Sequence, residues 1–380
     1  MKHFITSLAL LSTACGTTSH QSVPTSTAAP PALPHLAQEA WNAPSARNSP
    51  PSNVYVFKGV DLFGARGDDR ERILRRLTLP VPGTSVDPSQ QAFIDRLIES
   101  KKRVLEDHAY AFCRFSLGQW LPKHEMYLTV DLIELGDEWR MPFFAAPTGD
   151  VPEPEGLFAA WRDYQALLRQ LRGEGAVPEY GDGHDSCHAL VCHGGFAHPR
   201  LAPLEQRFLD DVPRNADTLV RVLREDKDAG KRFSSLMLLP YVSSREWLVR
   251  SVLPSVKDPD DGVRNEALRM LGELQNGQPR VLVPLDPLLE ALWFPLTSDR
   301  NKAGWALVRL LQTEGNVHRQ HILERSGAAL LTMLGMNSYL EHAPAHDVFT
   351  LLAGRDLGED VGAWSQWLAQ QKLTPPAASP

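Results

Sequence analysis

The chain has 380 residues, of which 43 % are hydrophobic and 22 % charged, and its formal net charge is −7. This length allows two domains, and the composition is that of an ordinary globular protein. The acidic balance excludes a general nucleic-acid-binding protein, which would carry an excess of Lys and Arg.

The first fifteen residues have the organisation of an export signal. Lys2 supplies the charge, residues 4–11 form an apolar run too short to span a bilayer, and small residues precede Cys15. The segment LSTAC, residues 11–15, resembles the lipobox of bacterial lipoproteins, although Ser12 stands where that family usually has Leu. The resemblance implies cleavage before Cys15 and lipidation of that cysteine. Ordinary cleavage, which would give a secreted protein, is the alternative.

Residues 16–52 are rich in Pro, Ser, Thr and Ala and show no apolar periodicity. Such a segment cannot bury enough apolar surface to offset the entropy of ordering it, so we expect a disordered tether. Two or more acyl chains on Cys15 would anchor the chain stably to a membrane. Gly16 stands where some bacteria use Asp to retain lipoproteins in the inner membrane, which favours the outer membrane.

Residues 53–203 predict a mixed α/β module, with an all-helical module as the alternative. Apolar residues recur at helical spacing around Phe93, Leu97 and Val104, and they alternate with polar ones along residues 128–134. The expected elements are a strand over 54–57, helices over 69–77, 89–112 and 157–171, and a β-hairpin with strands 127–135 and 139–144.

The stretch HDSCHALVCHGGFAH, residues 184–198, contains two cysteines and four histidines. Cys187 and Cys192 are close enough in sequence to form a small disulfide loop in an oxidising compartment. Cys113 would then be left over, and its apolar neighbours predict a buried thiol.

Two other interpretations of this stretch remain open. Cys187, Cys192, His193 and His184 could supply the four ligands of a zinc site, with His188 or His198 as substitutes for His184. Alternatively, the spacing C-x-x-x-x-C-H resembles a rarer haem-attachment spacing of some multihaem cytochromes, whereas the usual signal is C-x-x-C-H. No G-x-S-x-G, H-E-x-x-H or P-loop motif occurs, which favours a non-enzymatic protein.

Internal repeats begin after residue 204. The segments 226–239 and 258–271 align without gaps at an offset of 32 residues. A third copy covers 298–311, with Leu307 and Leu310 at the matching leucine positions. Repeats of 30 to 45 residues that each contain two helices indicate an α-solenoid, because one helix pair cannot bury its apolar stripe alone.

At these residues the chain resembles the HEAT-repeat family. The phrase VKDPDDGVRNEALRMLGEL, residues 256–274, has that family's Pro-Asp turn, Val-Arg pair and leucine-rich second helix. The resemblance covers about 215–371, and Lys302-Ala303 replace Val-Arg in the third unit. We expect the arginine of one unit to reach the aspartate of its neighbour. HEAT arrays act mainly as protein-interaction surfaces, so the resemblance implies a binding protein.

The sequence thus predicts a mainly α protein in which a C-terminal α-solenoid of HEAT-like helix pairs follows a smaller mixed α/β module. Its parts are a lipoprotein-type signal peptide (1–15), a disordered tether (16–52), the mixed module (53–203), the HEAT-like repeats (204–371) and a disordered tail (372–380). The expected function is that of a cell-envelope lipoprotein, attached to the membrane through Cys15, whose repeat face binds another protein. The alternative is a periplasmic metal- or haem-binding protein that uses Cys187 to His198.

Overall fold

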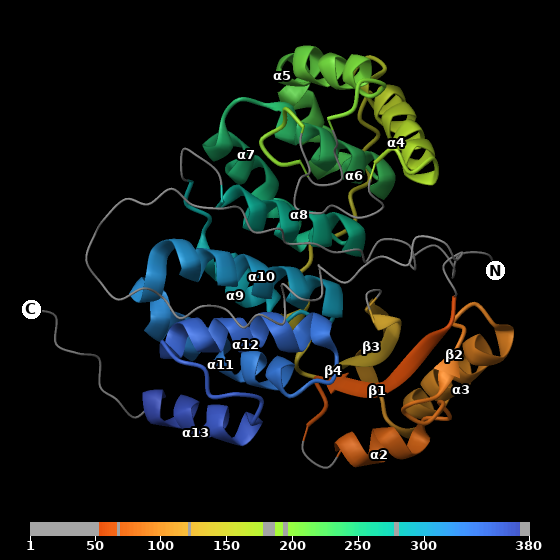
Figure 1. The fold of residues 1–380 in the computed structure, drawn as a ribbon, viewed down its shortest axis with the longest axis vertical. Helices are drawn as coiled ribbons and strands as arrows, with labels where there is room; N and C mark the ends of the chain where they lie inside the picture. Colours follow the sequence, from red (N-terminus) through yellow and green to blue (C-terminus); the bar gives the residue numbers. More distant parts are fainter. Residues whose placement is uncertain are drawn as a thin grey trace, which may run out of the picture. The chain divides into compact units, whose positions relative to one another are not determined.

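The computed structural model describes residues 53–66, 69–120, 123–177, 187–192, 197–276 and 281–372. These residues form a mainly helical protein with a small four-stranded sheet in its N-terminal region (Figure 1). The predicted signal peptide and tether lie outside the described residues, as does the predicted tail beyond residue 372. Among the described ranges, no helix is long and apolar enough to cross a membrane.

By their contacts the described residues form two compact units. The first unit includes 53–142 and 286–372, and the second covers 143–285. The sequence predicts a domain boundary after residue 203. In the structure, residue 203 lies in a long helix that begins at Ala202. The first unit therefore combines the sheet with the last helices of the chain.

The sheet of the first unit has the strand order β2-β1-β4-β3, with β1 and β4 parallel and the other pairs antiparallel. Successive side chains of a strand point to opposite faces, and both faces of the central strand β4 are buried. One face packs on the helices α2 and α3, and the other carries the polar residues Thr129 and Asp131. The elements are β1 (Tyr55–Phe63), α2 (Asp69–Arg76), β2 (Ser85–Val86), α3 (Gln91–Asp107), β3 (Tyr110–Trp120) and β4 (Glu125–Glu134).

The sequence misplaces two elements of this module. The helix expected over 89–112 ends at Asp107, because the aromatic and branched residues after it pair with β4 as strand β3. The strand expected over 139–144 is wrong, since Glu138–Arg140 form a short 3₁₀ turn. Arg140 points inward there and donates to the carbonyls of Leu132 and Trp293. The other helices agree with the sequence to within two residues, and the strand expected over 54–57 extends to Phe63.

Five helices complete the first unit. In this unit α10 and α11 both contact α12, and α13 contacts α11 (Figure 1). A Cβ atom on Gly304 would lie 2.9 Å from the Cβ of Pro344, so glycine permits the close approach of α10 and α12. Trp364 is fully buried and stacks on Phe349, as expected of a helix that closes the core. The helices are α9 (Leu285–Ala291), α10 (Thr297–Glu314), α11 (Arg319–Leu334), α12 (Tyr339–Ala353) and α13 (Val361–Lys372).

The helices of the second unit pack against one another, and not always against their neighbours in the sequence. Helix α5 contacts α4 and α6, α6 contacts α8, and α7 contacts α8. An aromatic core forms where Tyr164, Phe208 and Tyr241 meet. The helices are α4 (Leu157–Gly173), α5 (Ala202–Glu225), α6 (Ala229–Leu238), α7 (Arg245–Val252) and α8 (Asp261–Leu274), with 3₁₀ turns η3 (Leu239–Tyr241) and η4 (Leu253–Lys257).

The same arginine recurs in three helices. Arg232, Arg264 and Arg300 are each the fourth residue of their helix, α6, α8 and α10 respectively. Each donates from Nη1 to the carbonyl six residues earlier, which fixes the incoming chain against the first turn of the helix. The accepting carbonyls are those of Asp226, Asp258 and Phe294, at 3.0, 2.7 and 2.9 Å. In α10 the corresponding arginine is therefore Arg300, two residues before Lys302 and three before Ala303, the pair that the leucine alignment suggested.

Arg232 also links the start of α6 to Asp258, just before α8, as the sequence predicts for the arginine of one segment and the aspartate of the next. Its Nε and Nη2 atoms donate to the two carboxylate oxygens of Asp258 at 2.9 and 2.8 Å, and both side chains are buried. Asp258 in turn accepts from the backbone N–H of Asp260, the residue that caps α8. The start of α6 is thereby fixed to the start of α8.

Replacing Arg232 by alanine should destabilise the protein by about 3–5 kcal/mol, because the Asp258 carboxylate would stay buried without its counter-charge. Urea unfolding measures this change. The matched control is Arg221→Ala, which removes an exposed arginine 3.9 Å from Glu225 and should change the stability by less than about 1 kcal/mol. Equal effects of the two changes would show that the Arg232–Asp258 pair does not hold the helix pairs together.

Candidate functional site

The Cys187–Cys192 loop belongs to the second unit. The two sulfur atoms are 2.20 Å apart and the Cα atoms 5.5 Å apart, so the cysteines form the disulfide expected from their spacing. A bonded sulfur is not a thiolate, and it is the thiolate that binds zinc or attacks a haem vinyl group. In this state the loop offers neither of the two sulfur ligands that the metal and haem interpretations need.

The histidines of the stretch are only partly described. His184 and His193 lie outside the described residues. The His188 ring lies 3.1 Å from the Glu205 carboxylate, which also accepts from the His188 backbone N–H at 2.8 Å. His198 accepts from the backbone N–H of Arg200. Within the described part of the chain, no group of three or more His, Cys, Asp or Glu side chains is placed to hold a metal ion.

Backbone contacts fasten the loop to the helices beneath it. The N–H of Leu190 donates to the carbonyl of Pro240 at 2.8 Å, and Arg245 donates to the carbonyl of Leu190. Val191 is buried by this packing. The loop therefore covers the turn between α6 and α7 rather than projecting into solvent.

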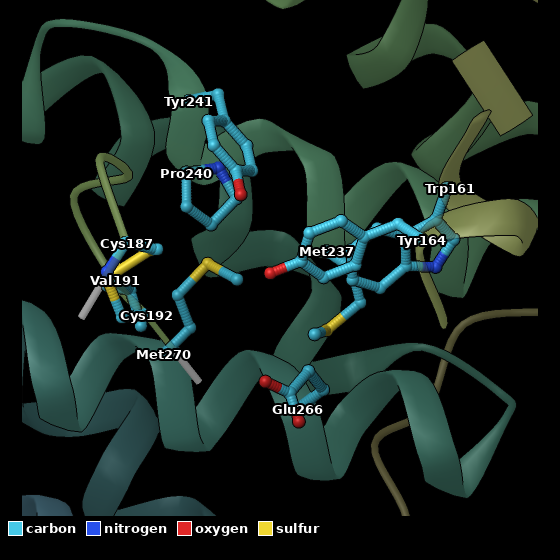
Figure 2. A pocket seen from close by; sticks show the side chains of 10 residues that line it. All are labelled: Trp161, Tyr164, Cys187, Val191, Cys192, Met237, Pro240, Tyr241, Glu266 and Met270. Atoms are coloured by element: carbon cyan, nitrogen blue, oxygen red, sulfur yellow. A yellow bond between two sulfur atoms is a disulfide. The ribbon is translucent and has the colours of Figure 1, made fainter. Parts of the chain in front are cut away.

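A small pocket lies under the loop (Figure 2). The disulfide and Val191 line one side, and Met270 and Glu266 reach it from α8. The centre of a water molecule can reach only about 20 Å³ of this space. That volume suffices for roughly one water molecule, whereas small-molecule sites usually measure about 300 Å³ or more. The pocket in this form is part of a packed core and not a substrate site.

Cys113, the cysteine outside the pair, lies in strand β3 and is half-buried. Burial raises the pKa of its thiol to about 11. A thiol with that pKa is almost wholly protonated at neutral pH, and the thiol form is a poor nucleophile. Cys113 is therefore suited to packing against the apolar core on its face of the sheet and not to catalysis. The sequence predicts a buried thiol, and in the structure the side chain is partly exposed.

The first unit contains a cluster of buried charges that the sequence did not reveal. Arg300 of α10 donates from Nη2 to Asp131 of β4 at 2.7 Å and from Nε to Glu341 of α12 at 2.6 Å. All three side chains are 0 % exposed. The guanidinium also lies over the ring of Phe63, 3.7 Å from its centroid, and Ser116 donates to Asp131.

The cluster has two carboxylates for one guanidinium, so protonation of one carboxyl group balances its charge. Burial raises the pKa of Glu341 to about 7, and burial also raises the pKa of Asp131. Oε2 of Glu341 is buried and has no hydrogen-bond partner among the described residues. Because no solvent reaches these groups, they cannot meet a substrate, and the cluster serves to connect the sheet with α10 and α12.

An open hollow on the second unit has the size of a ligand site. It lies between α5 and α7, and its volume is about 450 Å³. Trp247, Arg250 and Ser243 line it from the α7 side, and Arg214 and Asp217 from α5. Arg214 is paired with Asp211, whereas Arg250 is exposed and bonds to no carboxylate in the described ranges. The hollow thus presents an indole ring beside an accessible cation.

The Glu341 carboxyl group should make the stability depend on pH. Its pKa is raised above the ordinary 4.5, so the folded state binds the proton more tightly than the unfolded state. The resulting stabilisation is complete below pH 4.5 and is lost as pH rises through about 7, with a total of up to about 3 kcal/mol. Glu341→Gln, which imitates the protonated form, should flatten this dependence in urea unfolding between pH 5 and 8.

The control for this experiment is Glu324→Gln, which changes an exposed carboxylate on α11 that accepts a hydrogen bond from Gln320. It should leave the slope of stability against pH as in the unchanged protein. An unaltered slope in Glu341→Gln would contradict a neutral Glu341 in the folded state.

Alkylation and intact mass test the disulfide. In protein purified from an exporting host, Cys187 and Cys192 should resist alkylation until a reductant is added, and no metal or haem mass should appear. Opening this short loop should lower the stability by about 2 kcal/mol. Alkylation of both cysteines after a chelator alone, or a mass increase equal to haem, would instead establish the metal or haem interpretation.

Comparison with known proteins assigns no function to this chain. No family model, no curated protein and no solved structure matches the chain. The described chain is mainly helical, with a disulfide loop over a small pocket, a buried charge cluster and an open hollow beside Trp247.

Proposed function

We propose that this chain is a lipid-anchored protein of the cell envelope that binds another protein through HEAT-like helix pairs. The observation that carries the proposal is the bond from Arg232 to Asp258, which joins the starts of α6 and α8. An arginine that reaches the aspartate of the next unit is what the HEAT-like sequence pattern requires. Stacked helix pairs provide extended surfaces for partner proteins.

The hollow between α5 and α7 is the surface that we assign to the partner. These two helices precede α6 and α8, so in a HEAT-like array they are the first helices of neighbouring pairs. Tryptophan and arginine are the residue types that most often dominate the binding energy of protein interfaces. A partner with an apolar side chain next to a carboxylate would pack on Trp247 and pair with Arg250.

The remaining sites favour binding over catalysis. The pocket under the disulfide loop is too small for a substrate, and Asp131 and Glu341 are fully buried against Arg300. Catalytic acids and bases must come within hydrogen-bond reach of a reacting group. The ionisable groups of these two sites instead hold helices, strands and loops in place.

Anchoring through Cys15 is the second part of the proposal. It is supported by the apolar run and small residues before Cys15 and by the Pro-, Ser- and Thr-rich residues that follow it. The partner would then lie within reach of a protein tethered to a membrane, with the outer membrane favoured by Gly16. Replacing Cys15 with serine would leave the chain without its acyl chains.

Site-specific cross-linking tests the proposal in the exporting host. A photoreactive phenylalanine analogue in place of Trp247 should give one covalent adduct of defined mass with an envelope protein. Arg250→Glu should abolish the adduct by repelling the partner's carboxylate, whereas Arg221→Glu, an equal charge change on the exposed part of α5, should leave it intact. Absence of an adduct, or an adduct indifferent to Arg250→Glu, would refute binding at this hollow.

A further inference from the structure

Two histidines and two carboxylates meet where the chain leaves α12. His342 and His346 lie one turn apart on that helix, and their rings stack with centroids 5.9 Å apart. Residues 354–360 connect α12 to α13, and they contribute Asp356 and Glu359. We name His342, His346, Asp356 and Glu359 the histidine latch.

His342 has an acceptor at each ring nitrogen. Its Nδ1 lies 2.7 Å from the carbonyl oxygen of Leu334, and its Nε2 lies 2.7 Å from Oε2 of Glu359. A carbonyl oxygen and a carboxylate can only accept, so these two contacts hold the ring between acceptors and fix its orientation.

His346 is surrounded by negative charge. Nε2 lies 3.0 Å from Asp356, and Nδ1 lies 3.9 Å from Asp347 of its own helix. The nearby Asp347 carboxylate and the charges of Asp356 and Glu359 raise the pKa of His346, and burial opposes them. The ring of Trp364, which lies on α13, meets the His346 ring edge to face.

The segment that the histidines hold also secures α13. The Asp356 carboxylate accepts from the Gly358 N–H at 2.7 Å, and the Gly358 carbonyl accepts from the indole N–H of Trp364 at 2.7 Å. Asp360 then accepts from the N–H of Gly362 in the first turn of α13. The position of α13 therefore depends on Asp356, Glu359 and the two imidazole rings that bind them.

We infer that the histidine latch is a pH-sensitive device that fastens α13 in acid and loosens it as pH rises. A histidine with a raised pKa contributes its stabilisation fully below the ordinary value of 6.5 and loses it above the raised value. Loss of the His346 proton would leave Asp356 without its cation and would remove the attraction between that cation and Glu359. Opening of α13 would uncover Trp364 and Trp367, which are buried against Phe349. This inference does not depend on the proposed function.

Amide hydrogen exchange of the full chain tests the inference at pH 5.5 and 8.5. After correction for the intrinsic pH dependence of exchange, residues 361–372 should lose protection at pH 8.5 relative to pH 5.5, because the deprotonated latch no longer favours the closed position of α13. Helix α4 of the second unit is the internal reference, and its opening should change much less.

Two sets of variants make the result specific. Glu359→Gln changes a mostly exposed side chain, so the fold should survive, and opening of α13 at pH 5.5 should rise towards its value at pH 8.5. His342→Gln with His346→Gln should remove most of the pH dependence of α13. His321→Gln, which changes an exposed histidine paired with Asp286, should keep it. Equal protection of α13 at both pH values, or full pH dependence in the double variant, would overturn the inference.

Discussion

The first unit depends on the burial of one guanidinium. Arg300 lies among residues from three distant parts of the chain, since Phe63 comes from β1, Asp131 from β4 and Glu341 from α12. Removing Arg300 would leave the Asp131 carboxylate without its counter-charge in a site that water does not reach, at a cost of several kcal/mol. The sheet and the C-terminal helices are therefore joined by electrostatics as well as by apolar packing. This explains why the contacts of the chain group residues 53–142 with 286–372 although more than 140 residues separate them.

Arg300 also shows that an arginine at the same position of a helix can bind different partners. In α6 the equivalent Arg232 pairs with Asp258, and in α8 Arg264 lies 3.9 Å from the centroid of the Phe143 ring. The bond to the carbonyl six residues earlier is common to all three, so it belongs to the local geometry of the helix start. What the remaining nitrogens bind differs from helix to helix. One sequence feature thus holds two helix pairs together in the second unit and connects a sheet to helices in the first.

These differences also explain what the sequence could predict. The spacing of the aspartates and arginines in 226–239 and 258–271 predicted the bond from Arg232 to Asp258, because both repeats keep the same residues. Arg300 was missed because the alignment followed leucines, which many helices share. In addition, Phe294 stands six residues before Arg300, whereas an aspartate, Asp258, stands six residues before Arg264. The strand β3 was missed because its pairing partner β4 decides its conformation, and helical spacing in 91–107 gave no sign of where the helix ends. Likewise, spacing predicted the disulfide, but the pocket beneath it is assembled from α4, α6, η3 and α8 and has no local signal.

Helix α12 carries two groups, Glu341 and His346, whose pKa values are both raised by folding. Glu341, on the side that meets Arg300, has a raised pKa because burial disfavours its charged form. His346, on the side that meets residues 354–360, has a raised pKa because carboxylates favour its charged form. The causes are opposite, yet in both cases the folded state keeps its proton up to a higher pH than the unfolded state does. Folding of the first unit is therefore coupled to proton uptake through this one helix, from its core-facing side and from the side that holds α13.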